Sequence, residues 1–531
     1  MPPDSMQADP SAPVSAMSPA HHLASVAGPT RWVKVLDQTR CIGCHACTTA
    51  CKSENQVPVG VDRTYVKAVD VGRFPNVRRA FQVTRCNQCE DAPCVTACPT
   101  RAMYRRQDGI VDFDKRICIG CKACIAACPY DAIFINPQDH SAEKCNFCAH
   151  RIEIGLEPAC VVACPTEAIL VGDLHDPTSV VSRLVQREAV AVRRPEKHTR
   201  PGLYYKGAHQ STLDPLGATR PDGGTYAWAE MRSGMDVVHS GHPRNHGAHT
   251  ASAAAVISYD VAHTIPWGWR VSLYTWTKGV AAGAYLVPVL LAVFASLSWS
   301  SSLLRFVGPL VALGFLGLTG LLLVWDLKHP RRFYLLFTRH QWRSWLVRGA
   351  CILGLFGAVL VSQLLIAVAG STEAEKVLAG VGVPVSLMAA VYTAYLFAQA
   401  RGRDLWQSPI LGPHLAIEAL LVGAGALLPA AAHLAHRALH PLEVLVAFSA
   451  AAHLLLRVAE TTPHHPTAHA RLAAREMTHG RYALPFWIGA FGLALGILAP
   501  FAGWWAGVVA LIALVPHEHA YVQAAQAVPL A

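Results

Sequence analysis

Long apolar segments follow one another through the second half of the chain, from Trp267 onward, with polar loops between them. A helix that spans a bilayer needs about 20 mostly apolar residues, and no open sheet edge can face lipid. We therefore predict an all-α polytopic membrane bundle of about eight transmembrane helices. The predicted spans are 267–297, 303–325, 345–368, 377–398, 409–432, 441–458, 482–499 and 501–515. The last two are short and meet at Pro500, so they form either a tight hairpin of two spans or one broken helix.

The sequence before residue 266 divides into three further regions, and residues 266–531 form the membrane domain. Residues 1–30 are rich in Pro, Ala, Ser and Met, without an apolar signal core or a twin-arginine pair, which predicts a disordered tail. Residues 31–173 contain four Cys-rich units, which predict a duplicated α+β fold. Residues 174–265 are rich in Gly, Pro and His, which predicts a connector along the membrane surface. We interpret its stretch HSGHPRNHGAH as a polar loop, with a metal-binding tract as the alternative.

Sixteen of the seventeen cysteines lie in four tight runs before residue 165. The runs are Cys41-x2-Cys44-x2-Cys47-x3-Cys51, Cys86-x2-Cys89-x4-Cys94-x3-Cys98, Cys118-x2-Cys121-x2-Cys124-x3-Cys128 and Cys145-x2-Cys148-x11-Cys160-x3-Cys164. Two of them have the spacing of bacterial ferredoxins, in which three close cysteines bind one cubane cluster and the fourth reaches a neighbouring one. Sixteen thiolates therefore fit four [4Fe-4S] clusters in a tandem bacterial-ferredoxin-like domain.

Two other uses of cysteine fit the pattern less well. Structural zinc usually takes two separated Cys-x2-Cys pairs, because four ligands must surround one tetrahedral ion. Disulfide frameworks belong to small, cysteine-dense domains in oxidising compartments. The four runs instead show ordered ferredoxin spacing within a chain of 531 residues.

The crossing of each fourth cysteine to a partner cluster predicts which runs pair. Runs 86–98 and 118–128 form the tighter central pair, so the two outer runs pair with each other. The predicted ligand sets are Cys86, Cys89, Cys94 with Cys128; Cys118, Cys121, Cys124 with Cys98; Cys41, Cys44, Cys47 with Cys164; and Cys145, Cys148, Cys160 with Cys51.

From about Val33 to Asp173 the chain resembles the four-cluster electron-transfer subunits of the molybdopterin oxidoreductase superfamily. The stretches that carry the resemblance are RCIGCHACTTACKSEN, RCNQCEDAPCVTACPT, RICIGCKACIAACPYDA and KCNFCAHRIEIGLEPACVVACPTEAI. The resemblance implies a separate large catalytic subunit with a molybdenum or tungsten bis-pterin cofactor as the partner. No pterin or substrate site is visible in this chain.

Most of residues 265–531 resembles the membrane subunits of the NrfD/PsrC (polysulfide reductase) type. The matching stretches are WGWRVSLYTWTKGVAAGAYLVP, LLLVWDLKHPRRFYLLF, SPILGPHLAIEALLVGAGALL and EHAYVQAAQAVPLA. This resemblance implies an eight-helix anchor that reacts with membrane quinone and binds no haem. The iron–sulfur and membrane subunits, which are usually separate chains, are fused here.

Composition and charge agree with a membrane protein. The chain is 52% hydrophobic and only 15% charged, with a net charge of +10. The basic residues gather in loops on the side of the Cys-rich domain, whereas the opposite side has only Arg305, Lys376 and Arg437. Because Lys and Arg are retained in the cytoplasm, we predict an inner (cytoplasmic) membrane protein with its iron–sulfur domain in the cytoplasm. The alternatives are that the basic loops dock a partner, or that the domain is exported together with a partner by the twin-arginine route. A basic membrane surface explains the charge better than nucleic-acid binding does.

Ionisable residues within the predicted spans are the candidates for chemistry, because a buried charge costs a few kcal/mol in a bilayer. Lys278 lies in the first span and Asp326 ends the second. On the fifth, His414 and Glu418 are one turn apart and therefore share a face, and His453 and Arg457 repeat that spacing on the sixth. The alternative is that such groups only form hydrogen bonds between helices or reach the membrane surface.

A quinone takes up two protons with two electrons, so its pocket needs hydrogen-bonding groups and a titratable route to water. The NrfD resemblance implies a pocket at the end of the bundle nearest the clusters. We therefore expect the quinone near Trp269, Tyr274, Asp326, His329 and His414. Deeper residues suit a proton path instead: Lys278, Glu418 and His453. Haem between His414 and His453 is the competing cofactor, and we expect none.

Three functions are compatible with this pattern. The first is a relay of electrons between the pterin subunit and the quinone pool, menaquinone or ubiquinone, through four clusters. The second is a module that moves protons across the membrane as electrons pass. The third is a membrane-anchored ferredoxin carrier without quinone chemistry. The direction of electron flow stays open, because cluster potentials depend on hydrogen bonding, charge and exposure.

Overall fold

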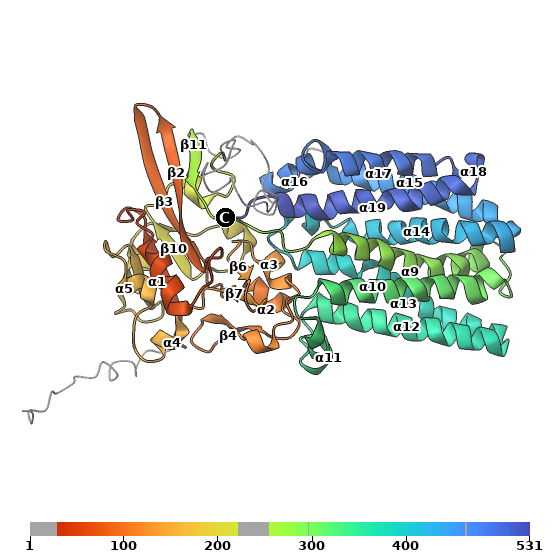
Figure 1. The fold of residues 1–531 in the computed structure, drawn as a ribbon, viewed down its shortest axis with the longest axis horizontal. Coiled ribbons are helices and arrows are strands. Elements are labelled where there is room, and N and C mark those ends of the chain that lie inside the picture. The colour runs from red at the N-terminus through yellow and green to blue at the C-terminus, as the bar shows by residue number, and fades with distance from the viewer. Residues whose placement is uncertain (1–28, 221–253, 296, 462–464) are drawn as a thin grey trace, which may run out of the picture.

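The computed structural model describes residues 29–220, 254–295, 297–461 and 465–531. A Cys-rich α+β domain lies at one end and a bundle of long helices at the other (Figure 1). The predicted tail, residues 1–30, and the histidine-rich stretch of the connector fall almost wholly outside the described residues.

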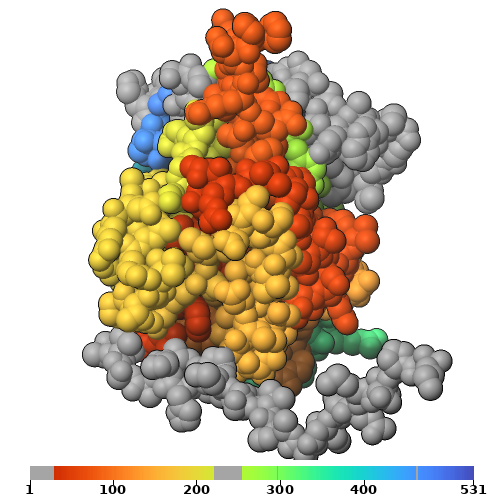
Figure 2. Space-filling view, turned by 90° about the vertical axis from the view of Figure 1, so that its left-hand side faces the viewer, coloured from red at the N-terminus to blue at the C-terminus, as the bar shows by residue number. Residues whose placement is uncertain are grey.

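Four small sheets form the scaffold of the Cys-rich domain. One has the strand order β8-β1-β10-β9, one has the order β11-β2-β3, and two are hairpins, β4-β5 and β6-β7. The strands are β1 (Trp32–Asp37), β2 (Thr64–Arg73), β3 (Asn76–Arg85), β4 (Met103–Arg105), β5 (Val111–Phe113), β6 (Ile133–Ile135), β7 (Ala142–Lys144), β8 (Ile169–Asp173), β9 (Val190–Ala191), β10 (Leu203–Lys206) and β11 (Ala255–Tyr259). The long β2-β3 hairpin projects beyond the body of the domain (Figure 2).

Short helices follow the cysteine runs. Five of them, α1 to α5, begin within a run, and Cys47, Cys94, Cys124 and Cys160 lie in α1, α2, α3 and α5. The helices of this domain are α1 (Ala46–Asn55), α2 (Pro93–Ala97), α3 (Ala123–Ala127), α4 (Ala149–Ile152), α5 (Ala159–Val162), α6 (Val180–Arg187) and α7 (Gln210–Leu213), with 3-10 turns at Lys115–Ile117 and Pro195–Lys197.

The described part of the predicted connector, 174–265, contributes to the sheets of this domain. β10 pairs in parallel with β1, and β11 pairs with β2. The folded unit therefore extends past residue 173, and this part does not form a separate strip on the membrane surface. Its strands are short and lie between Gly and Pro residues, which hid the alternation of buried and exposed positions in Leu203–Lys206.

The bundle contains seven helices, among the described residues, that are long and apolar enough to cross a membrane. Those helices are α9 (Trp269–Phe294), α10 (Gly308–Asp326, continuous with a π-helical turn Leu303–Val307), α12 (Trp345–Ala369), α13 (Thr372–Ala398), α14 (Leu411–Leu434), α15 (His436–Thr461) and α19 (Trp504–Ala527). The shorter helices are α11 (Leu335–Thr338), α16 (Ala468–Thr478), α17 (Ala483–Gly496) and α18 (Ala499–Ala502), with 3-10 turns at Pro330–Arg332 and Asp404–Gln407.

The last two predicted spans form a hairpin of α17 and α19. Their packing is antiparallel, because Gly489 faces Ala513 and His517 whereas Gly496 faces Ala510. α17 has only 14 residues. α19 continues twelve residues beyond the predicted end at 515, because the polar residues after Pro516 are buried inside the bundle.

Helices α9 and α14 pack with their backbones in close contact at glycines. A Cβ atom added at Gly283 would lie 1.8 Å from the Ala419 carbonyl oxygen. Since a backbone atom cannot move aside as a side chain can, we predict that Gly283→Ala lowers the free energy of unfolding by about 1–3 kcal/mol. Thermal unfolding of the detergent-solubilised protein measures this loss.

Gly314→Ala is the matched control for that substitution. Gly314 also lies within a membrane helix, but a Cβ atom there meets nothing within 4 Å. Equal melting temperatures for the two variants would contradict the close α9–α14 contact.

The loop between α10 and α12 holds the Cys-rich domain against the bundle. The backbone N–H of His329 donates to the carbonyl of Ile119, and Nη1 of Arg332 donates to the carbonyl of Cys118. Nε2 of Gln341 donates to the carbonyl of Cys98. These bonds therefore hold the third cysteine run and the end of the second run against the end of the bundle.

Candidate functional site

The sixteen cysteines of the runs form four neighbourhoods. Cys89 interacts electrostatically with Cys86, Cys94 and Cys128, and Cys124 interacts with Cys98, Cys118 and Cys121. In the other half, Cys51 interacts with Cys145, Cys148 and Cys160, and Cys41 interacts with Cys44 and Cys164. These neighbourhoods have the same members as the four ligand sets that run pairing predicts, with Cys47 adjoining Cys41.

Contacts between neighbourhoods place them in one row. Cys47 interacts with Cys160, which joins the first set to the set of Cys51. Cys86 interacts with Cys145, and Cys94 interacts with Cys98. The order along the row is therefore the set of Cys41, the set of Cys51, the set of Cys86 and the set of Cys118.

The two ends of this row differ in their surroundings. Cys44 is exposed and Cys41 and Cys164 are half-buried. The helices next to them in the chain, α1 and α5, lie at the end of the domain away from the bundle (Figure 1). At the other end Cys121 is half-buried and lines a cavity in the bundle. Among the sixteen, all the remaining cysteines are buried.

The surroundings of the thiols suit [4Fe-4S] clusters. Cys98, Cys118, Cys121 and Cys124 line one small cavity together with Ile119 and Met103. All the cysteines are free thiols, and no group of three or more His, Cys, Asp or Glu among the described residues is placed to hold a single metal ion. Thiols that share a cavity without converging on one point fit a cubane better than they fit a zinc ion.

Arg85 is a further sign of a buried anionic group. Its side chain is 2% exposed, and its Nη1 donates to Sγ of Cys160 at 3.0 Å. Nε and Nη2 have no hydrogen-bond partner among the described residues, although Cys47 and Cys145 are close. Burial raises the pKa of the Cys160 thiol, but the charges of Arg85 and Lys34 lower it more, to about 7. The sequence reasoning did not single out Arg85 or Lys34.

We expect the Arg85→Leu variant to lower the reduction potential of the cluster predicted at Cys51, Cys145, Cys148 and Cys160. A buried positive charge stabilises the reduced, more negative cluster, so its removal disfavours reduction. The expected decrease is on the order of 100 mV, because a hydrogen bond to a charged group contributes about 1.5–3 kcal/mol and a tenfold change, about 1.4 kcal/mol, is 59 mV for one electron. A redox titration followed by electron paramagnetic resonance measures it, and an unchanged or higher potential would contradict this role.

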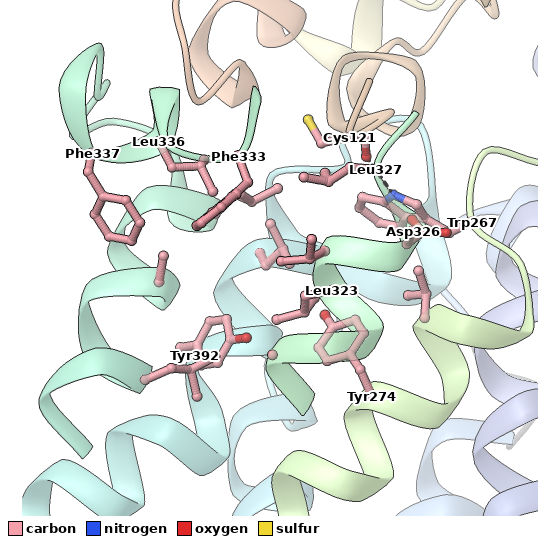
Figure 3. A pocket seen from close by; sticks show the side chains of 17 residues that line it. Cys121, Trp267, Tyr274, Leu323, Asp326, Leu327, Phe333, Leu336, Phe337 and Tyr392 are labelled. Carbon is pink, nitrogen blue, oxygen red and sulfur yellow. Dashed lines mark hydrogen bonds between the residues drawn. The ribbon is translucent and has the colours of Figure 1, made fainter. Parts of the chain in front are cut away.

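A cavity of about 250 Å³ lies among α9, α10, α12 and α13, at the end of the bundle next to the third cysteine run. Its lining is mostly apolar, and its polar side chains come from three helices: Tyr274 of α9, Asp326 of α10 and Tyr392 of α13. The hydroxyls of the two tyrosines point toward each other (Figure 3). The Tyr274 side chain is 2% exposed, and its hydroxyl has no hydrogen-bond partner of normal geometry among the described residues. A buried hydroxyl that lacks a partner of normal geometry in the described part of the chain therefore faces the cavity.

Two residues connect the cysteine run to this cavity. Nε1 of Trp267, which lines the cavity, donates to the carbonyl of Cys121 at 3.1 Å. Nζ of Lys122 lies 2.8 Å from a carboxylate oxygen of Asp326. The residue after Cys121 is therefore paired directly with a polar group of the cavity (Figure 3 labels Trp267, Cys121 and Asp326).

Three residues of the predicted quinone pocket lie elsewhere. Trp269 is half-exposed and packs against Trp325 on the outside of the bundle. His329 belongs to the interdomain loop, where its Nε2 faces the Ser141 hydroxyl. His414 is buried away from the cavity. The structure does not bring these three residues into the cavity, because spacing along a helix shows which residues share a face but not which helices are neighbours.

His414 belongs to a buried network within the bundle. Its Nε2 lies 3.0 Å from Nδ1 of His453, and its Nδ1 lies 3.1 Å from Glu460. Arg457 donates to Glu460, to Glu518 and to Nε2 of His517. Glu460, His517 and Glu518 were missed by the sequence reasoning, because they lay beyond the ends of the predicted spans.

Lys278 and Glu418 lie next to this network. Both are 1% exposed, and both oxygens of Glu418 lack a partner among the described residues. The Lys278 ammonium interacts electrostatically with Glu418 and Glu518, and it lies 5.3 Å from the ring of Tyr392. The predicted proton-path residues therefore lie together, and they meet the cavity at Tyr392.

Fold and site together define a multi-pass membrane protein with a ferredoxin-like iron–sulfur domain. Residues 77–174 match the family model described as a 4Fe-4S dicluster domain, and residues 259–515 match that of polysulphide reductase, NrfD. The chain thus belongs to the family of 4Fe-4S subunits of molybdopterin reductases and carries an NrfD-type membrane region.

Three relatives each match about a third of the chain. A tetrathionate reductase subunit of Salmonella typhimurium is 42% identical over 190 residues, 35% of this chain and 76% of its own length. Protein NrfC of Escherichia coli K12 is 44% identical over 177 residues, 33% of this chain and 79% of its own. A polysulfide reductase chain of Wolinella succinogenes is 42% identical over 171 residues, 32% of this chain and 90% of its own.

Proposed function

We propose that this chain relays electrons between membrane quinone and a separate molybdenum or tungsten bis-pterin catalytic subunit. The observation that carries the proposal is the row of four cysteine sets, which begins at exposed Cys44 and ends at Cys121 beside the bundle cavity. Each set would hold one [4Fe-4S] cluster, and bound clusters supply one-electron carriers. The buried cations and backbone N–H groups around the thiols would stabilise their negative charge.

The cavity would bind the quinone head. Tyr274 and Tyr392 offer hydroxyls for its carbonyl oxygens, and Asp326 offers a carboxylate for proton exchange. Oxidation of one quinol releases two electrons and two protons, so the site must pass electrons one at a time and provide an exit for protons. Lys122 holds the Asp326 carboxylate in place beside the cysteine run.

The catalytic partner would dock at the exposed end of the row. The relatives from tetrathionate reductase and polysulfide reductase indicate by their names that they belong to multi-subunit reductases. The substrate of the partner and the direction of electron flow follow from the partner and from the cluster potentials. The other expected partner is membrane lipid, and nucleic acid is not expected.

We place the bundle in the inner membrane with the Cys-rich domain on the cytoplasmic side. Basic residues of the loops that hold this domain support that orientation, because such residues are retained in the cytoplasm. The loop between α10 and α12 by itself contains four arginines: Arg331, Arg332, Arg339 and Arg343.

A second candidate function is proton translocation coupled to electron transfer. It is supported by the buried network of His414, His453, Arg457 and Glu460, together with Lys278 and Glu418. Charged groups inside a membrane protein commonly mark proton routes. Acidification or alkalinisation of proteoliposomes during quinone reduction, in excess of the protons of quinone chemistry itself, tests this function.

The iron content of the anaerobically purified chain tests the relay. We expect roughly sixteen irons and sixteen acid-labile sulfides per chain, because four cubanes contain that number. The third candidate, an anchored ferredoxin without quinone chemistry, predicts the same iron content but no electron exchange with quinone. A value near eight irons would remove two clusters from the row and contradict the proposal.

A further inference from the structure

The walls of the cavity differ in how well they are closed. Val271 and Tyr274 of α9 and Tyr392 and Leu396 of α13 are all buried. On the opposite side the lining residues of α10 and α12 are only partly buried or exposed. These residues are Gly320, Leu323, Val324, Leu346, Ala350 and Leu353. The cavity is therefore least closed between α10 and α12.

The outer faces of α10 and α12 are those of lipid-facing helices. Leu321 of α10 is 63% exposed and Leu355 of α12 is 53% exposed. α10 packs more extensively on α9, and α12 on α13, than the two pack on each other. Because a span-length apolar helix faces hydrocarbon where it does not face protein, an opening between α10 and α12 leads into the bilayer and not into water.

Helix α11 covers the cavity at its polar end. Phe333 and Phe337 both line the cavity, and yet Phe337 is 55% exposed (Figure 3). Tyr334 and Trp342, in the same loop, are also exposed. Exposed aromatic residues gather at the membrane–water interface, so α11 marks the surface of the bilayer and the opening lies below it.

Gly320 lies at this opening. It lines the cavity, is itself exposed, and a Cβ atom added there would meet nothing within 4 Å. Of the polar groups of the cavity, Asp326 lies at the end next to Cys121, and Tyr274 lies deeper, level with Tyr392 (Figure 3). A ligand with a polar head and a long apolar tail would thus place its head among the tyrosines and its tail across Gly320.

We infer that the gap between α10 and α12 is a lateral portal, which admits a long-tailed isoprenoid quinone from the bilayer and holds its tail. This inference rests on the proposed quinone function of the same cavity. It implies that the site selects its quinone partly by the tail. Gly320 and Leu353 form the two sides of the portal, and α11 covers its end.

The Gly320→Trp variant tests the portal, because a Cβ atom at this position meets nothing within 4 Å and the indole beyond it would occupy the opening. The purified full chain in lipid nanodiscs is mixed with a long-tailed quinone or with a tailless quinone, and the rate of electron exchange with the clusters is measured for each. We expect the rate with the long-tailed quinone to fall about tenfold more than the rate with the tailless one.

Gly317→Trp is the matched control. Gly317 is one turn away on the same helix, is also exposed with nothing within 4 Å, and does not line the cavity. It should leave both rates within about twofold of the unmodified protein. Leu353→Trp repeats the test from α12, and the iron content of each variant shows that it has folded.

The outcomes separate this inference from the proposed function. Equal losses with the two quinones, or no loss with either, would overturn the portal while leaving quinone exchange in place. No exchange by the unmodified chain with either quinone would refute the function itself. A quinone with a photoreactive tail provides a second measurement on the unmodified protein: we expect labelling of α10 and α12, and labelling confined to α14, α15 or α19 would overturn the portal.

Discussion

Replacing Cys121 with Ala is expected to disconnect the row of clusters from quinone. Cys121 belongs to the set nearest the bundle and lines the cavity itself. Loss of this cluster should lower the iron content from roughly sixteen to roughly twelve atoms per chain. Electron exchange with quinone should fall by about a hundredfold or more, whereas a strong chemical reductant should still reduce the three other clusters. Stopped-flow absorbance, read beside iron analysis, measures both effects.

Cys351→Ala is the control for this experiment. Cys351 is the one cysteine outside the four runs and lies exposed on α12, so its replacement should change neither iron content nor rate. A Cys121→Ala protein that exchanges electrons with quinone at the normal rate would mean that quinone reaches the row from another cluster.

Replacing Tyr274 with Phe should slow electron exchange with quinone by about ten- to a hundredfold, at unchanged iron content. The substitution keeps the ring but removes a buried hydroxyl that faces the cavity and has no partner of normal geometry among the described residues. The loss is of the size expected when a hydrogen bond of about 1.5–3 kcal/mol to an oxygen that gains charge is removed. Because the ring stays in place, the effect should not come with a large change in stability.

Tyr395→Phe is the matched control, since Tyr395 is half-exposed, stacks on Trp345 and does not line the cavity. Equal rates for Tyr274→Phe and Tyr395→Phe would place the quinone outside this cavity. Trp269→Phe adds a comparison between sequence and structure: Trp269 is a predicted pocket residue that lies on the outer surface, and we expect it to have no effect.

Much of the iron–sulfur domain could be predicted because its chemistry is local. The spacing within each cysteine run fixes which thiols can surround one cluster, and run pairing predicts the neighbours that Cys89 and Cys124 have in the structure. Arg85 could not be found in this way. It becomes a neighbour of Cys160 only when β3 packs across the domain, and 75 residues separate the two in the chain.

The spans of the bundle were predictable from apolar length, but their ends were not. α19 extends beyond Pro516 because His517 and Glu518 pair with Arg457 inside the bundle. A hydropathy pattern counts such residues as loop, because it contains no information about partners on other helices.

The position of the cavity near the cluster end of the bundle was predictable, but only some of its lining residues were. Tyr274 and Asp326 follow from their place near the cluster end of their helices. Lys122 and Phe333 do not, since one belongs to a cysteine run and the other to a surface loop that folds over the helices. Which helix faces lie together depends on tertiary packing, and a single sequence does not carry that information.

The most direct test of the account is electron exchange between the clusters and quinone in the isolated, full-length chain. The protein is placed in nanodiscs under anaerobic conditions, its clusters are reduced chemically, the excess reductant is removed, and a long-tailed quinone is added. We predict that the clusters are reoxidised as quinol forms, with one quinol for every two electrons released. Clusters that stay reduced in the presence of quinone, but are reoxidised by a soluble electron acceptor, would contradict the account.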